Sequence, residues 1–238
     1  RRLADTHGRA VRVVLAREDV VRTGPKRPPV AAGVGADGRG VLRVAWTPGS
    51  GSLDGFVRAV SSVAPGLAVE QVTVAGPLVA AELRGAGWME AAVLMAALGA
   101  TGAGRAGPGQ PVTVVSDDGA RATATVAADG AVAVTVAAGA VLDEVVLRSY
   151  VTGAVHQALG WVHSEGLAVD ADGNVLDLTI RSFGIVSARA MPPVAVTVEQ
   201  DEGRGAVRAG DAVMAAVAAA AWLAAGLPEA WPVERGGG

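Results

Sequence analysis

Four of the chain's Asp-Gly pairs lie between short stretches in which apolar and polar residues alternate. Asp-Gly suits a tight two-residue turn, because glycine readily adopts a positive φ. Alternation with a period of two is typical of a strand with one buried face. We therefore predict hairpins across the turns that end at Gly38, Gly119, Gly130 and Gly173. Their strands would be 30–34 and 40–46, 112–115 and 121–126, 123–127 and 131–136, and 167–169 and 175–180.

Other segments have apolar residues at helical spacing. Helices are predicted over residues 54–63, 83–98, 142–161 and 211–225. Further strands are predicted at 9–18, 69–74 and 194–198. This order of elements predicts an α+β fold, with antiparallel sheets and helices packed on one side.

A glycine-rich segment, residues 99–109, interrupts the pattern and is the best candidate for a linker. We predict an N-terminal block over residues 1–98, a linker over 99–110 and a C-terminal block over 111–238.

Composition excludes several classes of function. Half of the 238 residues are hydrophobic, yet Ala, Val and Gly dominate and only 3% are aromatic, so many small contacts must build the core. The net charge of −3 gives nucleic acid no basic surface to bind. No cysteine is present, which excludes disulfides, thiolate metal sites and iron–sulfur clusters held by this chain alone.

The sequence predicts no membrane segment. Its longest apolar stretch, residues 212–227, is shorter than the roughly 20 residues that span a bilayer. The N-terminal residues are charged and show no secretory signal. We therefore expect a cytoplasmic protein.

The segment 153–173 carries a motif that resembles a known family. It reads Gly-Ala-x-x-Gln-x-Leu-Gly at residues 153–160, continues with Glu165, and ends in an Asp-x-Asp-Gly turn. It is similar to the C-terminal molybdenum-cofactor domain of the xanthine dehydrogenase and aldehyde oxidase family. The resemblance implies that Gln157 contacts the pterin and that Glu165 holds the corner between helix and hairpin. A polar residue on a helix surface or between helices is the alternative for Gln157.

A second stretch matches the same family upstream. Arg84, Gly85, Ala86 and Gly87, followed by Glu90 and Ala91, are similar to an Arg-Gly-Ala-Gly-x-x-Glu-Ala turn that opens a helix beside the pterin. By resemblance, these four residues bind the cofactor, since glycine permits close approach and a helix N-terminus attracts anions. An ordinary glycine turn before a helix is the alternative.

The chain also departs from the family pattern. No Gly-Gln-Gly lies between Glu90 and Leu142, where the family has a principal cofactor contact. The loop 203–211 stands where the family has Gly-x-Gly-Glu, and neither Glu202 nor Asp211 falls in that pattern. No catalytic base is therefore assigned. No metal ligand is assigned either, since His156 and His163, seven residues apart, make a poor pair on a helix.

The resemblance implies a shortened relative of the molybdenum subunit. Such a chain would contribute part of a molybdopterin site in a hydroxylase or dehydrogenase of aldehydes or N-heterocycles. Iron–sulfur clusters and FAD would then lie on partner chains, or a larger molybdenum subunit would be the partner, in a hetero-oligomer. A non-catalytic scaffold or assembly subunit that has lost the cofactor site is the alternative.

Limited proteolysis tests the predicted linker. Glycine-rich segments are preferred cleavage sites when they are exposed, so the first cut is expected within residues 99–109. Earlier cleavage inside the hairpins of residues 112–136 would contradict the boundary.

Overall fold

The computed structural model describes residues 30–75, 78, 83–102, 107–166, 183–201 and 203–233, with side chains of the 83–102 helix described from 87 to 100. The predicted strands at 9–18, 167–169 and 175–180 lie outside these residues. The chain divides into two compact units, Arg1–Trp88 and Met89–Gly238. The division falls inside helix α4 (Leu83–Gly102), which also includes the first residues of the predicted linker. The linker itself stays a prediction.

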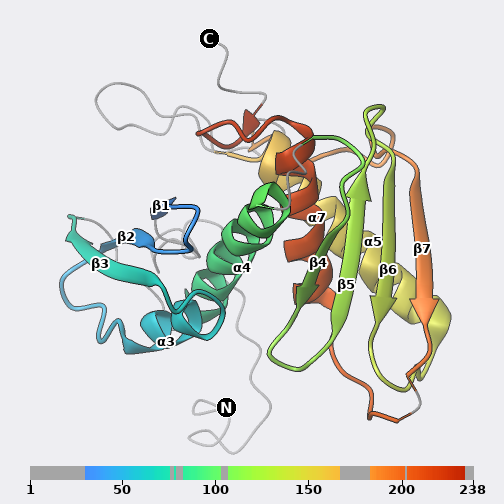
Figure 1. Ribbon diagram of the computed structural model, residues 1–238, viewed down its shortest axis with the longest axis horizontal. Coiled ribbons are helices and arrows are strands. Elements are labelled where there is room, and N and C mark those ends of the chain that lie inside the picture. Colours follow the sequence, from blue (N-terminus) through green and yellow to red (C-terminus); the bar gives the residue numbers. More distant parts are fainter. Residues whose placement is uncertain are drawn as a thin grey trace, which may run out of the picture. The chain divides into compact units, whose positions relative to one another are not determined.

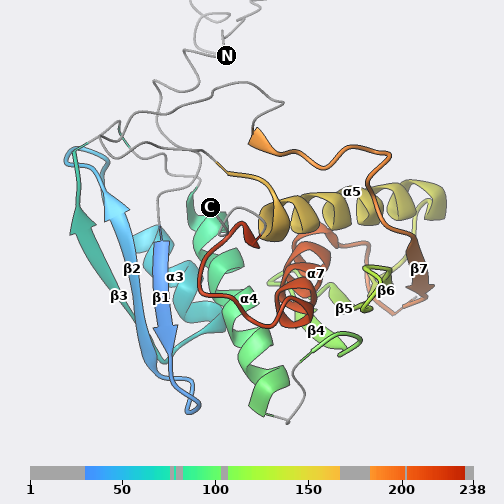
Figure 2. The ribbon, with the colours of Figure 1, turned by 90° about the horizontal axis from the view of Figure 1, so that it is seen from above.

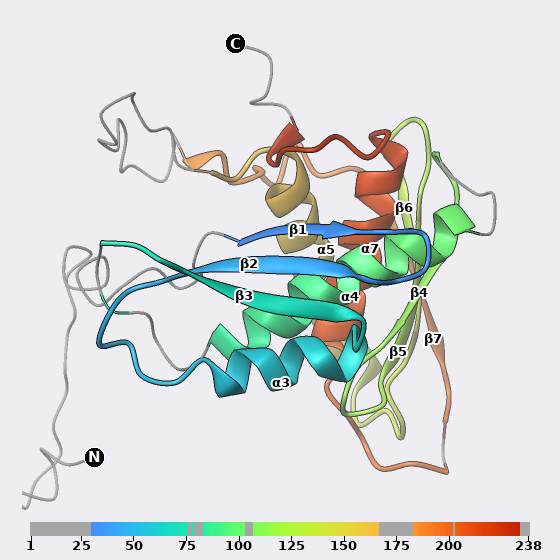
Figure 3. The same ribbon diagram turned by 60° about the vertical axis from the view of Figure 1, so that its left-hand side comes forward.

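The first unit contains a three-stranded sheet with the order β1-β2-β3 (Figure 3). Strands β1 (Val30–Val34) and β2 (Gly40–Trp46) form the predicted antiparallel hairpin, whose turn places Gly38 at a φ of 76°. Helix α3 (Asp54–Val63) then leads to β3 (Leu67–Thr73), which pairs parallel to β2.

Alternation along β2 builds the core of this unit. Leu42, Val44 and Trp46, every second residue, are buried. Phe56 and Val60 are buried on α3, one helical turn apart. One face of the hairpin and one face of the helix therefore supply the apolar surface, as both periodicities predict.

The second unit contains a four-stranded sheet with the order β4-β5-β6-β7. Strands β4 (Val112–Val115), β5 (Arg121–Val126) and β6 (Val132–Ala137) form an antiparallel meander. Its turns contain Gly119 and Gly130 at positive φ, which confirms both predicted hairpins. Strand β7 (Val194–Glu199) pairs parallel to β6.

Two helices cover one face of this sheet. Helix α7 (Gly210–Ala224) packs on β4, β5 and β6, and α5 (Glu144–His163) packs on α7 and β7. Figures 1 and 2 show both helices on the same side of the strands. Every residue from Ala215 to Ala221 is buried, so α7 is enclosed on all sides. Among the described residues, no helix has the length and apolar character needed to cross a membrane.

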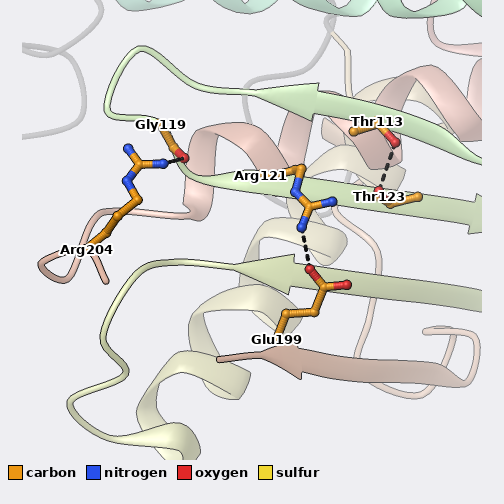
Figure 4. Close-up of polar contacts among 6 residues, drawn as sticks. All are labelled: Thr113, Gly119, Arg121, Thr123, Glu199 and Arg204. Carbon is orange, nitrogen blue, oxygen red and sulfur yellow. Dashed lines mark hydrogen bonds and ion pairs between the residues drawn. The ribbon is translucent and has the colours of Figure 1, made fainter. Parts of the chain in front are cut away.

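Threonines form a row across the opposite face of the sheet. The strand register places Thr113, Thr123, Thr135 and Thr197 side by side. The hydroxyl groups of Thr113 and Thr123 lie 2.8 Å apart (Figure 4). The next row carries an ion pair between Arg121 and Glu199 that ties β5 to β7 across β6. Apart from the exposed Val115, the side chains on this face are polar or alanine, in contrast to the buried face.

The predicted α+β class is confirmed, but the prediction of purely antiparallel sheets is wrong. Each sheet contains one parallel pair, β2 with β3 and β6 with β7. The reason is the connection: a two-residue turn reverses the chain, whereas a helix between two strands returns it to the same end of the sheet. Asp-Gly turns predict the hairpins and carry no information about strands that follow a helix.

The enclosure of α7 predicts that its small side chains cannot be enlarged. Ala216→Leu should lower the free energy of unfolding by about 1–3 kcal/mol, since extra methylenes must displace a packed sheet or helix. Ala133→Leu, on the exposed face of β6, is the matched control and should change it by less than about 0.5 kcal/mol. Urea unfolding measures both, and equal effects would contradict the packing.

Candidate functional site

Helix α5 carries most of the downstream motif. Asp143 caps its first turn by accepting a hydrogen bond from the Val146 amide at 3.0 Å. The helix begins two residues after the predicted start and continues to His163. Ala154, Leu159 and Gly160 of the motif are buried. The family-like apolar positions are therefore core positions of the second unit.

The end of α5 is a tight corner between Gly160 and Glu165. The amides of Ser164 and Glu165 both donate to the Gly160 carbonyl, at 3.0 and 2.7 Å. The Glu165 side chain folds back over Gly160, so that a Cβ atom there would overlap its Oε1. Glycine is therefore required at 160 for the carboxylate to occupy this position. This geometry agrees with the role that the resemblance implies for Glu165.

A second segment is clipped to the same helix end. The His156 Nε2 atom lies 2.7 Å from the Val186 carbonyl, and the Ser164 hydroxyl donates to the Gly184 carbonyl at 2.5 Å. The Gly166 amide donates to the Phe183 carbonyl at 2.9 Å. Residues 183–186 are thus held along the end of α5, which leaves the corner only partly open to water.

This enclosure changes the acidity of Glu165. Burial raises the pKa of its carboxyl, and the charge of His156 lowers it by a smaller amount. A raised carboxyl pKa is a feature of many active sites, and structural carboxylates at buried corners share it.

Gln157 is exposed on α5, between the partly buried His156 and the buried Ala158. Its amide is accessible from solvent, which is compatible both with a contact to a cofactor and with an ordinary polar residue on a helix surface. The assignment of Gln157 to a cofactor therefore stays a prediction.

Residues 84–87 lie within helix α4 and not in a turn ahead of it, since the helix begins at Leu83. The side chains of Arg84 and Ala86 are outside the described part of the chain. Gly87 is packed against the ring of Phe56, and a Cβ there would come within 3.0 Å of the ring. This glycine thus serves the packing of α4 on α3. Cofactor binding by Arg84, Gly85, Ala86 and Gly87 stays a prediction, and these residues belong to a different unit from Gln157.

The loop of residues 203–209, just before α7, is held by two arginines. Arg204 lies over the β4–β5 turn and donates to the carbonyls of Gly119 and Asp118, at 3.0 and 3.4 Å (Figure 4). Arg208 forms an ion pair with Asp118 at 3.2 Å. Gly119 has a φ of 81°, and a Cβ there would overlap the Arg204 guanidinium. These contacts position the loop just before α7.

The same loop is pinned from its other side by backbone contacts. The Ala140 amide donates to the Arg204 carbonyl at 2.8 Å, and the Val207 amide donates to the Ala138 carbonyl at 2.9 Å. Gly139, at a φ of 68°, permits this approach. Sequence reasoning missed this clamp, because its partners are about 65 to 90 residues apart. Asp211 lies exposed in the first turn of α7.

The described residues form no metal centre of their own. Among them, no three His, Cys, Asp or Glu side chains gather closely enough to hold an ion. His156 is engaged with a backbone carbonyl, and His163 lies in the last turn of α5. What the described part of the chain brings together at the end of α5 is His156, Ser164 and Glu165.

Gly160→Ala should release Glu165 from its buried position and return its pKa toward the ordinary value. A raised folded pKa stabilises the protein below the unfolded value, about 4.3, and this contribution is lost as pH rises through the folded pKa. As pH rises from about 4.3 through the folded pKa, the free energy of unfolding of the variant should therefore fall by less than that of the parent. NMR titration of Glu165 and urea unfolding from pH 4 to 7 measure both effects.

Gly153→Ala is the matched control, because a Cβ at 153 meets no atom within 4 Å. It should leave the Glu165 pKa unchanged. An identical Glu165 pKa in both variants and the parent would contradict the proposed overlap.

Comparison with known proteins gives distant structural matches alone. No protein-family model and no curated protein matches the sequence. CO dehydrogenase of Oligotropha carboxidovorans matches with a TM-score of 0.38, and a Cu,Mo-CO dehydrogenase with 0.37; both are 12% identical over 83% of this chain and 34% of theirs. Quinoline 2-oxidoreductase from Pseudomonas putida 86 has a TM-score of 0.34 and 12% identity, covering 81% and 34%. Aldehyde oxidoreductase from Desulfovibrio desulfuricans ATCC 27774 has 0.33 and 15%, covering 83% and 28%. The chain spans about a third of the length of these proteins.

Proposed function

We propose that this chain is a subunit of a molybdopterin-dependent oxidoreductase, a hydroxylase or dehydrogenase of aldehydes or N-heterocycles, and contributes part of the cofactor site. The observation that carries the proposal is the corner at the end of α5. Gly160 and Glu165 are separate positions of the family-like motif, and the fold places one directly over the other. Their contact gives the motif a physical reason, since the glycine makes room for the carboxylate.

We propose that Gln157 and the start of α4 each make a partial contact with such a cofactor, and that the chain does not supply a complete site. Gln157 offers an exposed amide, and the start of α4 offers backbone N–H groups to an anion. Gly87 leaves less room for a cofactor, because the ring of Phe56 occupies the space beside it. When bound, the cofactor would supply the redox chemistry, and this chain would help to bind and orient it. No proton-transferring residue is assigned.

The proposal requires partner chains. The sequence has no cysteine, so iron–sulfur clusters cannot be held here, and electrons would have to leave through other subunits. We propose iron–sulfur and flavin subunits, or a larger molybdenum subunit, as partners in a cytoplasmic hetero-oligomer.

A non-catalytic scaffold or assembly subunit is the second candidate, and the arginine-held loop favours it. Between Gly203 and Gly210, the loop contains no carboxylate, and its arginines are engaged with the β4–β5 turn. A general base contributes roughly 10²–10⁴-fold to such reactions. A chain without one could keep the fold and the partner surface while another chain performs the reaction.

Metal analysis separates the two candidates. The isolated chain should bind molybdopterin weakly or not at all, while its complex with the native partners should contain molybdenum. In that complex, Gln157→Ala should lower cofactor affinity by about tenfold, the effect of one lost hydrogen bond to a charged ligand. Thr152→Ala, an exposed neighbour on α5, is the control and should have no effect.

The outcomes discriminate clearly. Intact assembly with unchanged molybdenum content in Gln157→Ala would favour the scaffold. Absence of molybdenum from every complex that contains the chain would reject the oxidoreductase proposal. Stoichiometric molybdenum in the isolated chain would show that the site is complete without partners.

A further inference from the structure

The start of α5 and the residue just ahead of its cap expose apolar side chains to an unusual degree. Leu142, before the helix, is 89% exposed; on the helix, Val145, Tyr150 and Val146 are 78%, 72% and 47% exposed. The first buried residue of the helix is Val151. Large side chains are normally scattered singly on a surface, whereas a contiguous group marks an interaction site.

One line of this surface has the spacing of a helix–helix seam. Val146, Tyr150, Gly153 and Gln157 follow one another at intervals of four, three and four residues, and all four are exposed. This spacing keeps them on one face of the helix, as in pairs of helices that pack along their length. Gly153 leaves an open space on the seam beside the large side chain of Tyr150, since nothing lies within 4 Å of its missing Cβ.

We propose that this seam binds a second copy of the chain, with the two α5 helices antiparallel. A two-fold axis that passes midway between Tyr150 and Gly153 places each Tyr150 opposite the partner's Gly153. The ring then fills the space above the glycine, and the same contact forms twice, as two-fold symmetry requires. Val146 lies opposite the partner's Gln157 in the same register.

The charges of the helix favour a second copy as the occupant. A surface that pairs with itself meets its own charges, and like charges in contact are costly. None of the four seam residues is Asp, Glu, Lys, Arg or His. The nearby charges of Glu144 and Arg148 are already paired within the chain at 2.7 Å.

The extent of the seam sets the strength of the dimer. A contact limited to one face of one helix falls at the low end of specific interfaces, below about 1,200 Å². We therefore expect a Kd of about 10–100 µM, in the range of weak reversible dimers. In this dimer the partner's Val146 covers Gln157, so the dimer and a contact of Gln157 with a cofactor exclude each other.

Sedimentation equilibrium of the full chain between about 5 and 500 µM tests the proposal. The parent should show a concentration-dependent dimer. Tyr150→Glu and Val146→Glu should each raise the Kd of the dimer at least tenfold, because a charged side chain would then be buried in the contact with the second copy. Both positions are exposed in the single chain, so circular dichroism should show unchanged folding. Val115→Glu is the matched control, an exposed valine on the opposite face of the sheet, and should leave the Kd unchanged.

Disulfide trapping tests the orientation, and the absence of native cysteine makes the result unambiguous. Tyr150→Cys combined with Gly153→Cys should form a covalent dimer under mild oxidation, since the two positions face each other across the axis. Tyr150→Cys alone should form much less, because the two copies of residue 150 are offset along the helices.

Several results would overturn the proposal. These are a chain that remains monomeric at 500 µM, a dimer that is unaffected by both glutamate variants, and a dimer that Val115→Glu disrupts. Efficient linking by Tyr150→Cys alone would indicate parallel helices and would also reject it. So would a monomeric chain whose seam binds a different protein in the native complex.

Discussion

The enclosure of α7 by small side chains is the constraint on which the second unit depends. Seven consecutive residues, Ala215 to Ala221, are buried between the sheet and α5. Alanine and valine allow the backbone of the helix to approach its neighbours closely, and many small contacts replace the few large ones of an aromatic core. Because α7 is held in this way, the loop before it and the helix beside it have defined positions.

The two features that bear on the proposed function lie at opposite ends of this packed layer. At one, Arg204 and Arg208 fasten the loop before α7 to the β4–β5 turn. At the other, Gly160 makes room for Glu165 at the end of α5, and His156 and Ser164 hold residues 183–186 beside it. Both arrangements depend on glycines, at 119 and 160, whose missing Cβ lets a long side chain lie directly on the backbone.

Much of the fold follows from local pattern. The Asp-Gly turns at Gly38, Gly119 and Gly130 predicted three hairpins, and helical spacing predicted α3 over the observed residues. The candidate site followed from local pattern less well. Residues 84–87 form part of α4, and Phe56 occupies the side of Gly87 where the motif suggested an open turn. A motif carries the residue types of a binding turn, but the partner that fills the space beside a glycine comes from elsewhere in the chain.

The sequence alone determined the types of the described elements, the α+β class, the absence of cysteine ligands and the three hairpins at Gly38, Gly119 and Gly130, because turn chemistry and side-chain periodicity act over a few residues. Tertiary structure alone decided the parallel pairs β2–β3 and β6–β7, the clamp of Arg204 on Gly119 and the exposure of Tyr150. These three features depend on which segments, distant in sequence, come into contact in the folded chain. The free energy of such contacts comes from burial between residues distant in sequence, so no local pattern records them.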